Sequence, residues 1–253
     1  MMNVLEKHPK AHVSILLLMT FLAMGLVACG SNALKSLDEP EPDEEATLNM
    51  EDGKPDSAIK VLESALASDS ANYQYISLLS AAYAQKFGVD TLTFAEKLGT
   101  NATSSSGATS GNASVITAMY PILPAATDAN IAGISYASAL LVSIPASNRT
   151  SADNFKLALL STAETSIRTK KLDRNGDGIL SIDEIGTLDT SNAAGILSAI
   201  TNAASAVVLA QAAGFSAEEA TAAVTQIQSI LATQPGATDE EKLQNYLRTT
   251  QSG

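Results

Sequence analysis

Apolar residues recur at helical spacing through the first structured part of the chain. From residue 54 to residue 88 they return every three to four positions, which is the spacing of one face of a helix. The pattern is interrupted between Asp69 and Asn72, so it predicts two amphipathic helices joined by a turn. The apolar positions are Ile59, Leu62, Leu66, Tyr75, Leu78, Leu79, Ala82 and Tyr83.

Prolines and capping residues bound the apolar segments that follow. The segment 128–144 is apolar nearly all round, which predicts a central, buried helix. No stretch alternates in the manner of a strand, so the expected fold class is all-α, as a helical bundle or a short helical array. The helices predicted here cover residues 115–123, 128–144, 151–171, 191–213, 217–233 and 240–249.

Two segments lack this periodicity. Residues 29–48 are acidic and contain prolines, and we expect them to form a solvated tether without fixed structure. Residues 100–114 are rich in Ser, Thr, Gly and Asn, which predicts a loop. The predicted organisation is therefore a first helical region at 49–99 and a second at 115–253.

The first helical region resembles a tetratricopeptide unit. The resemblance lies in A-I-x-x-L-x-x-A-L of the first helix, the turn D-S-A-N, and L-L-x-x-A-Y-A of the second helix. It implies a short helical array that binds a protein or peptide. No further copy follows at a fixed period, and such arrays usually need three or more repeats. A plain helical bundle with the same spacing is the alternative.

Charge and composition exclude several classes of function. The formal net charge is -12 and basic residues do not cluster beyond Lys170 and Lys171, which argues against nucleic acid as a partner. The only histidines are His8 and His12, and the only cysteine is Cys29. If the first residues are removed, no imidazole or free thiol is left for nucleophilic catalysis or for zinc, haem or copper sites.

The first 28 residues contain the basic, apolar and small-residue regions of a signal peptide in the usual order. Lys7 and Lys10 precede an apolar run at 15–27, which is followed by Ala28 and Cys29. Such a run rises only about 20 Å as a helix, short of the roughly 30 Å hydrocarbon core of a bilayer. A removable signal segment is therefore expected rather than a stable membrane span.

The end of this segment, L-V-A-C, resembles the lipobox of bacterial lipoproteins. The resemblance implies that Cys29 is lipidated and becomes the first residue of a protein anchored in the bacterial cell envelope. Several acyl chains at about 0.8 kcal/mol per buried methylene would make the attachment permanent. In that family an aspartate after the cysteine marks inner-membrane retention, so Gly30 implies the outer membrane, facing the periplasm. An ordinary secretory signal with a chance cysteine is the alternative.

The stretch D-R-N-G-D-G-I-L-S-I-D-E, residues 173–184, resembles the calcium loop of the EF-hand family at each informative position. Gly178 stands at the sharp turn and Leu180 at the hydrophobic anchor. The resemblance implies Ca²⁺ as the bound ion, with oxygen donors from six residues. These are side-chain oxygens of Asp173, Asn175 and Asp177, the backbone carbonyl of Ile179, Ser181 directly or through water, and both carboxylate oxygens of Glu184.

Other interpretations of the loop are open. Asp, Asn and Gly also make plain solvated turns, and a degenerate loop would no longer bind an ion. Mg²⁺ fits this larger cage less well. The exit helix is interrupted by Gly186, and no second loop is present. A single EF-hand loop with a short exit helix predicts that the ion has a structural role, as a fixed brace between helices, and does not act as a conformational switch.

Together these patterns predict a non-enzymatic, calcium-binding lipoprotein that binds a protein or peptide partner in the envelope. An accessory or solute-binding subunit of a transport system is the alternative, and a pocket lined by Tyr73, Tyr83, Tyr120 and Tyr136 would favour it. A third class, an enzyme that uses two carboxylates, has no supporting spacing among the acidic residues.

Overall fold

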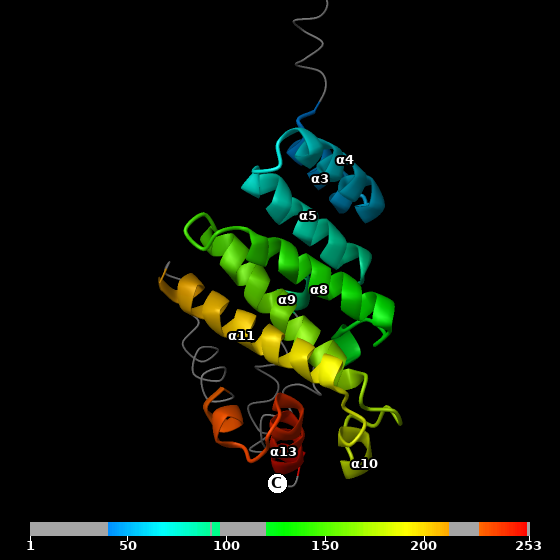
Figure 1. Ribbon diagram of the computed structural model, residues 1–253. Coiled ribbons are helices and arrows are strands. Elements are labelled where there is room, and N and C mark those ends of the chain that lie inside the picture. Colours follow the sequence, from blue (N-terminus) through cyan, green and yellow to red (C-terminus); the bar gives the residue numbers. More distant parts are fainter. Residues whose placement is uncertain (1–39, 92, 97–119, 213–227, 252–253) are drawn as a thin grey trace, which may run out of the picture. The chain divides into compact units, whose positions relative to one another are not determined.

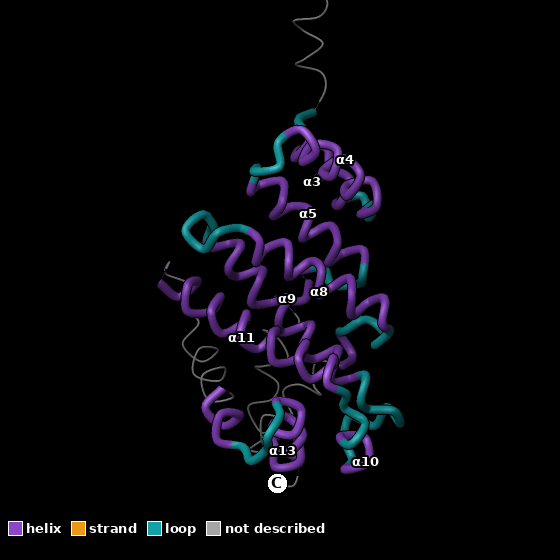
Figure 2. The backbone as a smooth tube through the Cα atoms, viewed as in Figure 1, coloured by secondary structure: helices purple, strands orange, loops and turns teal. Residues whose placement is uncertain are grey.

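The computed structural model describes residues 40–91, 93–96, 120–212 and 228–251. Regular structure in these residues is helical and none of them forms a strand (Figure 2), so the all-α prediction is confirmed. The elements are α3 (Pro42–Glu51), α4 (Pro55–Ser68), α5 (Tyr73–Lys86), the 3₁₀ helix η1 (Tyr120–Ile122), α8 (Asp128–Ser143), α9 (Ser151–Lys170), α10 (Ile182–Ile185), α11 (Thr190–Ala212) and α13 (Asp239–Gln251).

The chain divides after Glu41, and the residues from Pro42 onward form one unit. Within this unit the helices pack largely in chain order: α3 on α4, α4 on α5, α5 on α8, α8 on α9, α9 on α11 and α11 on α13 (Figure 1). Helix α3 also contacts α5, and α10 contacts α13. Helices α4, α5, α8, α9 and α11 therefore each pack between two other helices.

Helix α3 corrects the end of the tether predicted over residues 29–48, because residues 42–48 are helical; residues 29–39 lie outside the described residues. Pro42 is the first residue of the helix, where its fixed φ is favourable. Asp43, Glu44 and Glu45 in the first turn interact favourably with the positive end of the helix dipole. Ala46 is fully buried in a cluster with residues of α4 and α5. The acidic composition that suggested a tether thus marks the start of a helix, and tertiary packing stabilises it.

Helices α4 and α5 confirm the predicted pair. Pro55 opens α4, and the Asn72 side chain accepts a hydrogen bond from the backbone N–H of Tyr75 at 3.2 Å, which caps α5. The predicted apolar faces meet in the core formed with α3, in which Leu62 and Ala82 are fully buried.

Helix α8 begins at its predicted residue and ends one residue early. Thr127 caps it by accepting from the N–H of Asn130 at 3.2 Å, and Pro145 follows its end. The prediction of burial all round was wrong, because Tyr136 is 47% exposed and Val142 is 40% exposed. The helix is covered by α5 and α9 but leaves part of its apolar surface open.

In the second half, the helices predicted over 151–171, 191–213 and 240–249 are observed with ends that differ by at most two residues. Helix α9 begins after Thr150 and α13 after Thr238, each with reciprocal capping contacts. The predicted helix over 115–123 is reduced, in its described part, to η1, because Pro121 and Pro124 interrupt it. Of the predicted helix over 217–233, residues 228–233 are helical and the remainder lies outside the described residues.

Thr190–Leu209 of α11 is the one stretch in the described ranges that is long and apolar enough to cross a membrane. Close to half of it, 44%, is buried, and the helix packs against α9 and α13. A core helix of a helical unit has the same composition. The predicted signal peptide, Cys29 and the 100–114 loop lie outside the described residues.

Candidate functional site

The predicted calcium loop connects α9 to the single-turn helix α10. Leu172, which precedes the loop, and Leu180 within it are both buried in a cluster shared with α11 and α13. Gly176 has φ of 72° and Gly178 has φ of 80°, a left-handed conformation that glycine adopts without strain. The glycine at the predicted sharp turn therefore has the backbone that the turn requires.

The first three predicted ligand side chains fold back over the loop. Asp173 accepts from the backbone N–H of Gly176 at 2.7 Å and of Gly178 at 2.9 Å, through its two carboxylate oxygens. Asn175 accepts from the N–H of Asp177 at 2.9 Å. Asp177 accepts from the N–H of Ile179 at 2.7 Å and from the side-chain amide of Asn175 at 2.9 Å. These contacts wind the chain around its own oxygen atoms.

Glu184 closes the loop from its far end. One carboxylate oxygen accepts from the N–H of Arg174 at 2.9 Å and of Asn175 at 3.3 Å. The other accepts from the N–H and the hydroxyl of Ser181, at 2.9 and 2.8 Å. The hydrogen bonds from Ser181, followed by those from Arg174 and Asn175, lower the pKa of Glu184 to about 2. The carboxylate is thus ionised at neutral pH and joins both ends of the loop.

The loop also faces a buried phenol. Tyr120 is buried, and its hydroxyl has no hydrogen-bond partner among the described residues. Burial, together with the carboxylates of Asp173 and Glu184, raises its pKa above the ordinary value. Lys170, at the end of α9, donates to the backbone carbonyl of Tyr120 at 2.7 Å and so ties this residue to the entry of the loop.

The donor set fits a hard cation. Its oxygens come from carboxylates, an amide, a hydroxyl and the carbonyl of Ile179, whose side chain is 61% exposed. Within the described ranges, no three His, Cys, Asp or Glu side chains are gathered as metal ligands, because the loop carboxylates are directed at N–H groups. The residue types and the glycine conformations fit the predicted ion, whose binding stays a prediction.

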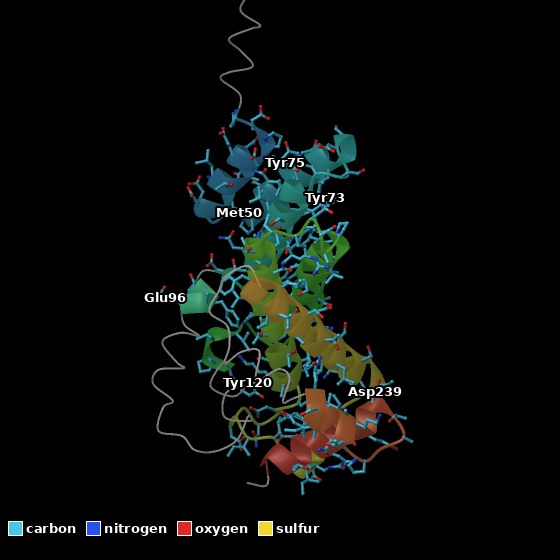
Figure 3. The ribbon with its side chains drawn as sticks, turned by 90° about the vertical axis from the view of Figure 1, so that its left-hand side faces the viewer. Met50, Tyr73, Tyr75, Glu96, Tyr120 and Asp239 are labelled. Carbon is cyan, nitrogen blue, oxygen red and sulfur yellow. The ribbon has the colours of Figure 1, made fainter. Side chains whose placement is uncertain are left out.

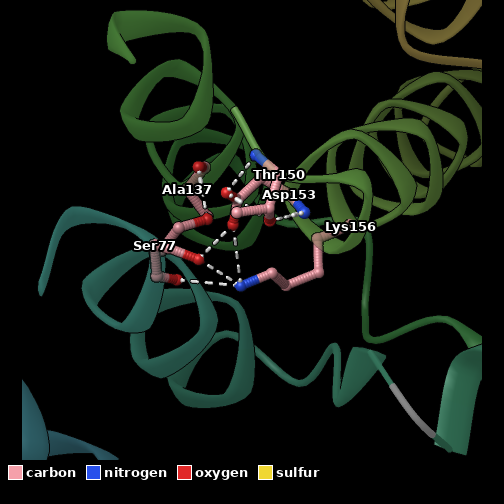
Figure 4. A network of polar contacts seen from close by, with 6 residues as sticks. Ser77, Ala137, Thr150, Asp153 and Lys156 are labelled. Carbon is pink, nitrogen blue, oxygen red and sulfur yellow. Dashed lines mark hydrogen bonds and ion pairs between the residues drawn. The ribbon is translucent and has the colours of Figure 1, made fainter. Parts of the chain in front are cut away.

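A second polar site, which the sequence did not reveal, lies between α5 and α9 (Figure 4). The hydroxyl of Ser77 on α5 donates to Asp153 on α9 and accepts from the ammonium group of Lys156. Lys156 also lies 3.4 Å from the Asp153 carboxylate. The other oxygen of Asp153 accepts from the N–H and hydroxyl of Thr150 at 2.9 and 2.7 Å. The hydroxyl of Ser77 thus joins α5 to an ion pair that lies within α9.

Electrostatics in this network follow from burial. Burial alone would raise the pKa of Asp153, but hydrogen bonds from Ser77 and Thr150 and the charge of Lys156 outweigh it and hold that pKa below its ordinary value. Burial lowers the pKa of Lys156, and the neighbouring carboxylate partly offsets this effect. Ser77 is buried and directs its proton to the carboxylate. The arrangement is that of an interhelical clamp.

The clamp forms part of the wall of an open pocket of about 730 Å³. One wall is a face of α3 that includes Glu44, Leu48 and Glu51. The facing wall is α5, with Tyr73 and Leu78, and the start of α9 closes the third side. The T-x-x-D capping spacing at 150–153 is a sequence signal that marks this place, since it predicts the start of a helix.

The four tyrosines proposed as a common pocket do not converge. Tyr73 lines the pocket described above, whereas Tyr83 packs edge-on against Tyr136 with ring centroids 4.7 Å apart. Tyr120 lies near Asp173 and Glu184 of the predicted calcium loop, well away from Tyr73 (Figure 3). The tyrosine pocket that would favour a transport subunit is therefore absent from this arrangement of described residues.

The clamp predicts a pH-dependent contribution to stability. Because the folded-state pKa of Asp153 is lowered, its contribution is fully present above the unfolded pKa of about 3.9 and is lost as pH falls through the folded pKa. We expect Asp153→Asn to reduce the free energy of unfolding by about 1.5 kcal/mol at pH 7. The difference from the wild type should shrink at pH 3, measured by urea unfolding. Asp128→Asn, at an exposed ion pair with Lys171, is the control and should have little effect at either pH. An undiminished difference at pH 3 would contradict the assignment.

Compared with protein-family models, curated proteins and solved structures, the chain has no significant match. Among the described residues, the candidate sites are the oxygen-rich loop at 173–184 and the pocket lined by α3, α5 and the start of α9.

Proposed function

We propose that this chain is a calcium-braced, lipid-anchored helical protein of the bacterial cell envelope, which acts as a non-enzymatic interaction scaffold. The observation that carries the proposal is the closed loop at 173–184. Glu184 contacts N–H groups of Arg174 and Asn175 across the loop, and Gly178 has the backbone conformation of the sharp turn. A plain solvated turn needs neither of these features.

In this proposal Asp173, Asn175, Asp177, Ser181 and Glu184 hold Ca²⁺ by their side-chain oxygens, together with the carbonyl of Ile179. When bound, the ion cancels repulsion among the three carboxylates. Residues next to the ligands then transmit the ordering of the loop to the helices. Leu172 and Leu180 fix the loop to the core shared by α11 and α13, so ordering the loop stiffens the connection between α9 and α11.

The anchor is proposed from the sequence alone. The L-V-A-C stretch supports lipidation at Cys29, and Gly30 supports the outer membrane as the destination. About a dozen residues would then separate the acylated cysteine from Pro42, where α3 begins. Mass spectrometry of the membrane fraction should detect an N-terminal Cys29 that carries acyl chains. A mature protein with an unmodified N-terminus would refute lipidation.

Calcium should stabilise the wild-type protein. With a Kd of about 0.1 mM and about 1 mM free calcium, linkage contributes about 1.4 kcal/mol. This corresponds to a rise of about 4 °C in the melting temperature. We expect Glu184→Gln to abolish most of this rise, because the amide cannot supply two charged oxygens but can still cap α10. Calorimetric melting with calcium and with a chelator measures the effect.

The neighbouring Asp183→Asn is the matched control. It removes the same charge from an exposed residue of α10 that is not a predicted ligand, so its calcium-dependent rise should equal that of the wild type. If calcium raised the melting temperatures of Glu184→Gln and Asp183→Asn by the same amount, the rise would come from general charge screening and not from binding in the loop. A wild-type melting temperature that chelation leaves unchanged would refute the brace.

A further inference from the structure

We propose that the pocket between α3, α5 and the start of α9 binds a basic, partly apolar peptide segment of a partner protein. This inference rests on the proposed scaffold function, to which it adds the chemistry and the place of the partner. The pocket volume of about 730 Å³ is within the range of sites that enclose a small ligand or a few side chains. It fits a short segment of a partner rather than a folded surface.

One set of side chains on α3 and another on α5 line the pocket. On α3, residues 43, 44, 47, 48 and 51 line it, and on α5, residues 73, 74, 77 and 78 line it. Both sets follow the three-to-four spacing of a single helix face. The clamp of Ser77, Asp153 and Lys156 ties α5 to α9 at the pocket wall, so two of the three walls are held together before any ligand binds.

The free charge of the pocket is negative. Lys156 pairs with Asp153, so these two charges offset each other. Asp43 accepts a hydrogen bond from the Gln74 side chain at 2.6 Å. Glu44 and Glu51 line the same wall, and neither has an ion pair or hydrogen bond from another side chain in the described part of the chain. Two available carboxylates on one helix face favour a cationic segment.

An exposed leucine lies between those carboxylates. Leu48 is 57% exposed and follows Glu44 by one helical turn, while Glu51 follows Leu48 by three residues. Tyr73 and Leu78 offer further apolar surface from α5. Apolar side chains bordered by charge are the composition of a protein interface. A segment that alternates Lys or Arg with Leu-like residues would pair with the carboxylates and also cover the apolar side chains.

Other occupants satisfy only part of this surface. Nucleic acids and anionic lipid headgroups would meet unpaired carboxylates, and a second copy of a chain with net charge -12 would bring like charge. A free polyamine would pair with Glu44 and Glu51 but would leave Leu48 in water. A basic segment with apolar side chains is the occupant that matches charge and apolar surface together.

The test uses three fluorescein-labelled decapeptides, which alternate Lys with Leu, Lys with Ser, or Glu with Leu. Their binding to the detergent-solubilised full chain is measured by fluorescence anisotropy. We expect the Lys/Leu peptide to bind most tightly. The double variant Glu44→Gln, Glu51→Gln should weaken it roughly 5- to 10-fold, from the loss of two exposed ion pairs. Leu48→Ser should weaken the Lys/Leu peptide and leave the Lys/Ser peptide unchanged.

The control variant Glu45→Gln, Asp52→Asn removes the same charge from the same part of the chain, at residues outside the pocket, and should change binding less than 2-fold. Equal losses in both double variants would overturn the inference, as would a Glu/Leu peptide that binds equally well or a Lys/Leu peptide that does not bind. The calcium-dependent melting of the same sample tests the brace separately. A partner that binds equally to the wild type and the Glu44, Glu51 variant would leave the scaffold intact and refute this pocket.

Discussion

Glu164→Ala is expected to reduce the free energy of unfolding by about 3 kcal/mol, because it leaves the guanidinium group of Arg168 buried without a counter-charge. Two nitrogens of Arg168 donate to one Glu164 oxygen, at 2.8 and 2.9 Å, and both side chains are largely buried, with exposed fractions of 14% and 6%. A third nitrogen reaches Asn192 at 3.4 Å on α11. The pair therefore lies at the contact between α9 and α11.

Gly195 explains why the charge is held in place. A methyl group at Gly195 would lie 2.3 Å from the central guanidinium carbon of Arg168, so the arginine packs directly on the backbone of α11. The side chain has little room to move toward water when Glu164 is lost. We expect the melting temperature to fall by about 9 °C, measured by calorimetry at neutral pH.

Two comparisons separate the cost of a buried, unpaired charge from the loss of an ordinary ion pair and from general damage to α9. Asp56→Ala, which removes the exposed ion pair with Lys86, should cost less than about 1 kcal/mol. The double variant Glu164→Leu, Arg168→Met removes both charges and keeps apolar volume, so it should recover most of the lost stability. A double variant as unstable as Glu164→Ala would show that packing, rather than charge, carries the effect.

Local signals predicted the helices well where capping residues and prolines agreed with apolar spacing. Asn72, Thr127 and Thr238 each lie at a helix start in the structure. Local composition failed where packing decided the outcome. Pro42 and the acids after it suggested a solvated tether, but burial of Ala46 against α4 and α5 stabilises a helix there.

The loop at 173–184 could be singled out from the sequence because its residues are contiguous and their spacing is characteristic, and its ion stays a prediction. The clamp was not, because Lys156 and Ser77 are 79 positions apart and each is unremarkable within its own helix. The pocket depends in the same way on the order in which α3, α5 and α9 pack. The four tyrosines do not share a pocket for the same reason, since Tyr73 on α5 and Tyr120 in η1 lie in separate parts of the fold.

Gly133→Ala is the second substitution with a large expected effect. A methyl group at Gly133 of α8 would lie 2.0 to 2.3 Å from three carbons of the Phe87 ring, which follows the end of α5. Alanine favours a helix by about 1 kcal/mol over glycine. Overpacking typically costs 1–3 kcal/mol and occasionally more, and here it must displace a ring at the contact between two helices. We expect a net loss of about 2 kcal/mol, measured by urea unfolding.

A thermodynamic cycle with Phe87→Ala tests this cause. Truncating the ring alone should destabilise the protein through lost burial, because Phe87 packs against the core that α8 and α9 share. Once the ring is absent, Gly133→Ala should become neutral or stabilising, since the helix preference of alanine is then unopposed. The coupling between the two substitutions should therefore be favourable by about 2 kcal/mol or more. Additive losses would mean that Gly133 is required for its backbone and not for the space that the Phe87 ring occupies.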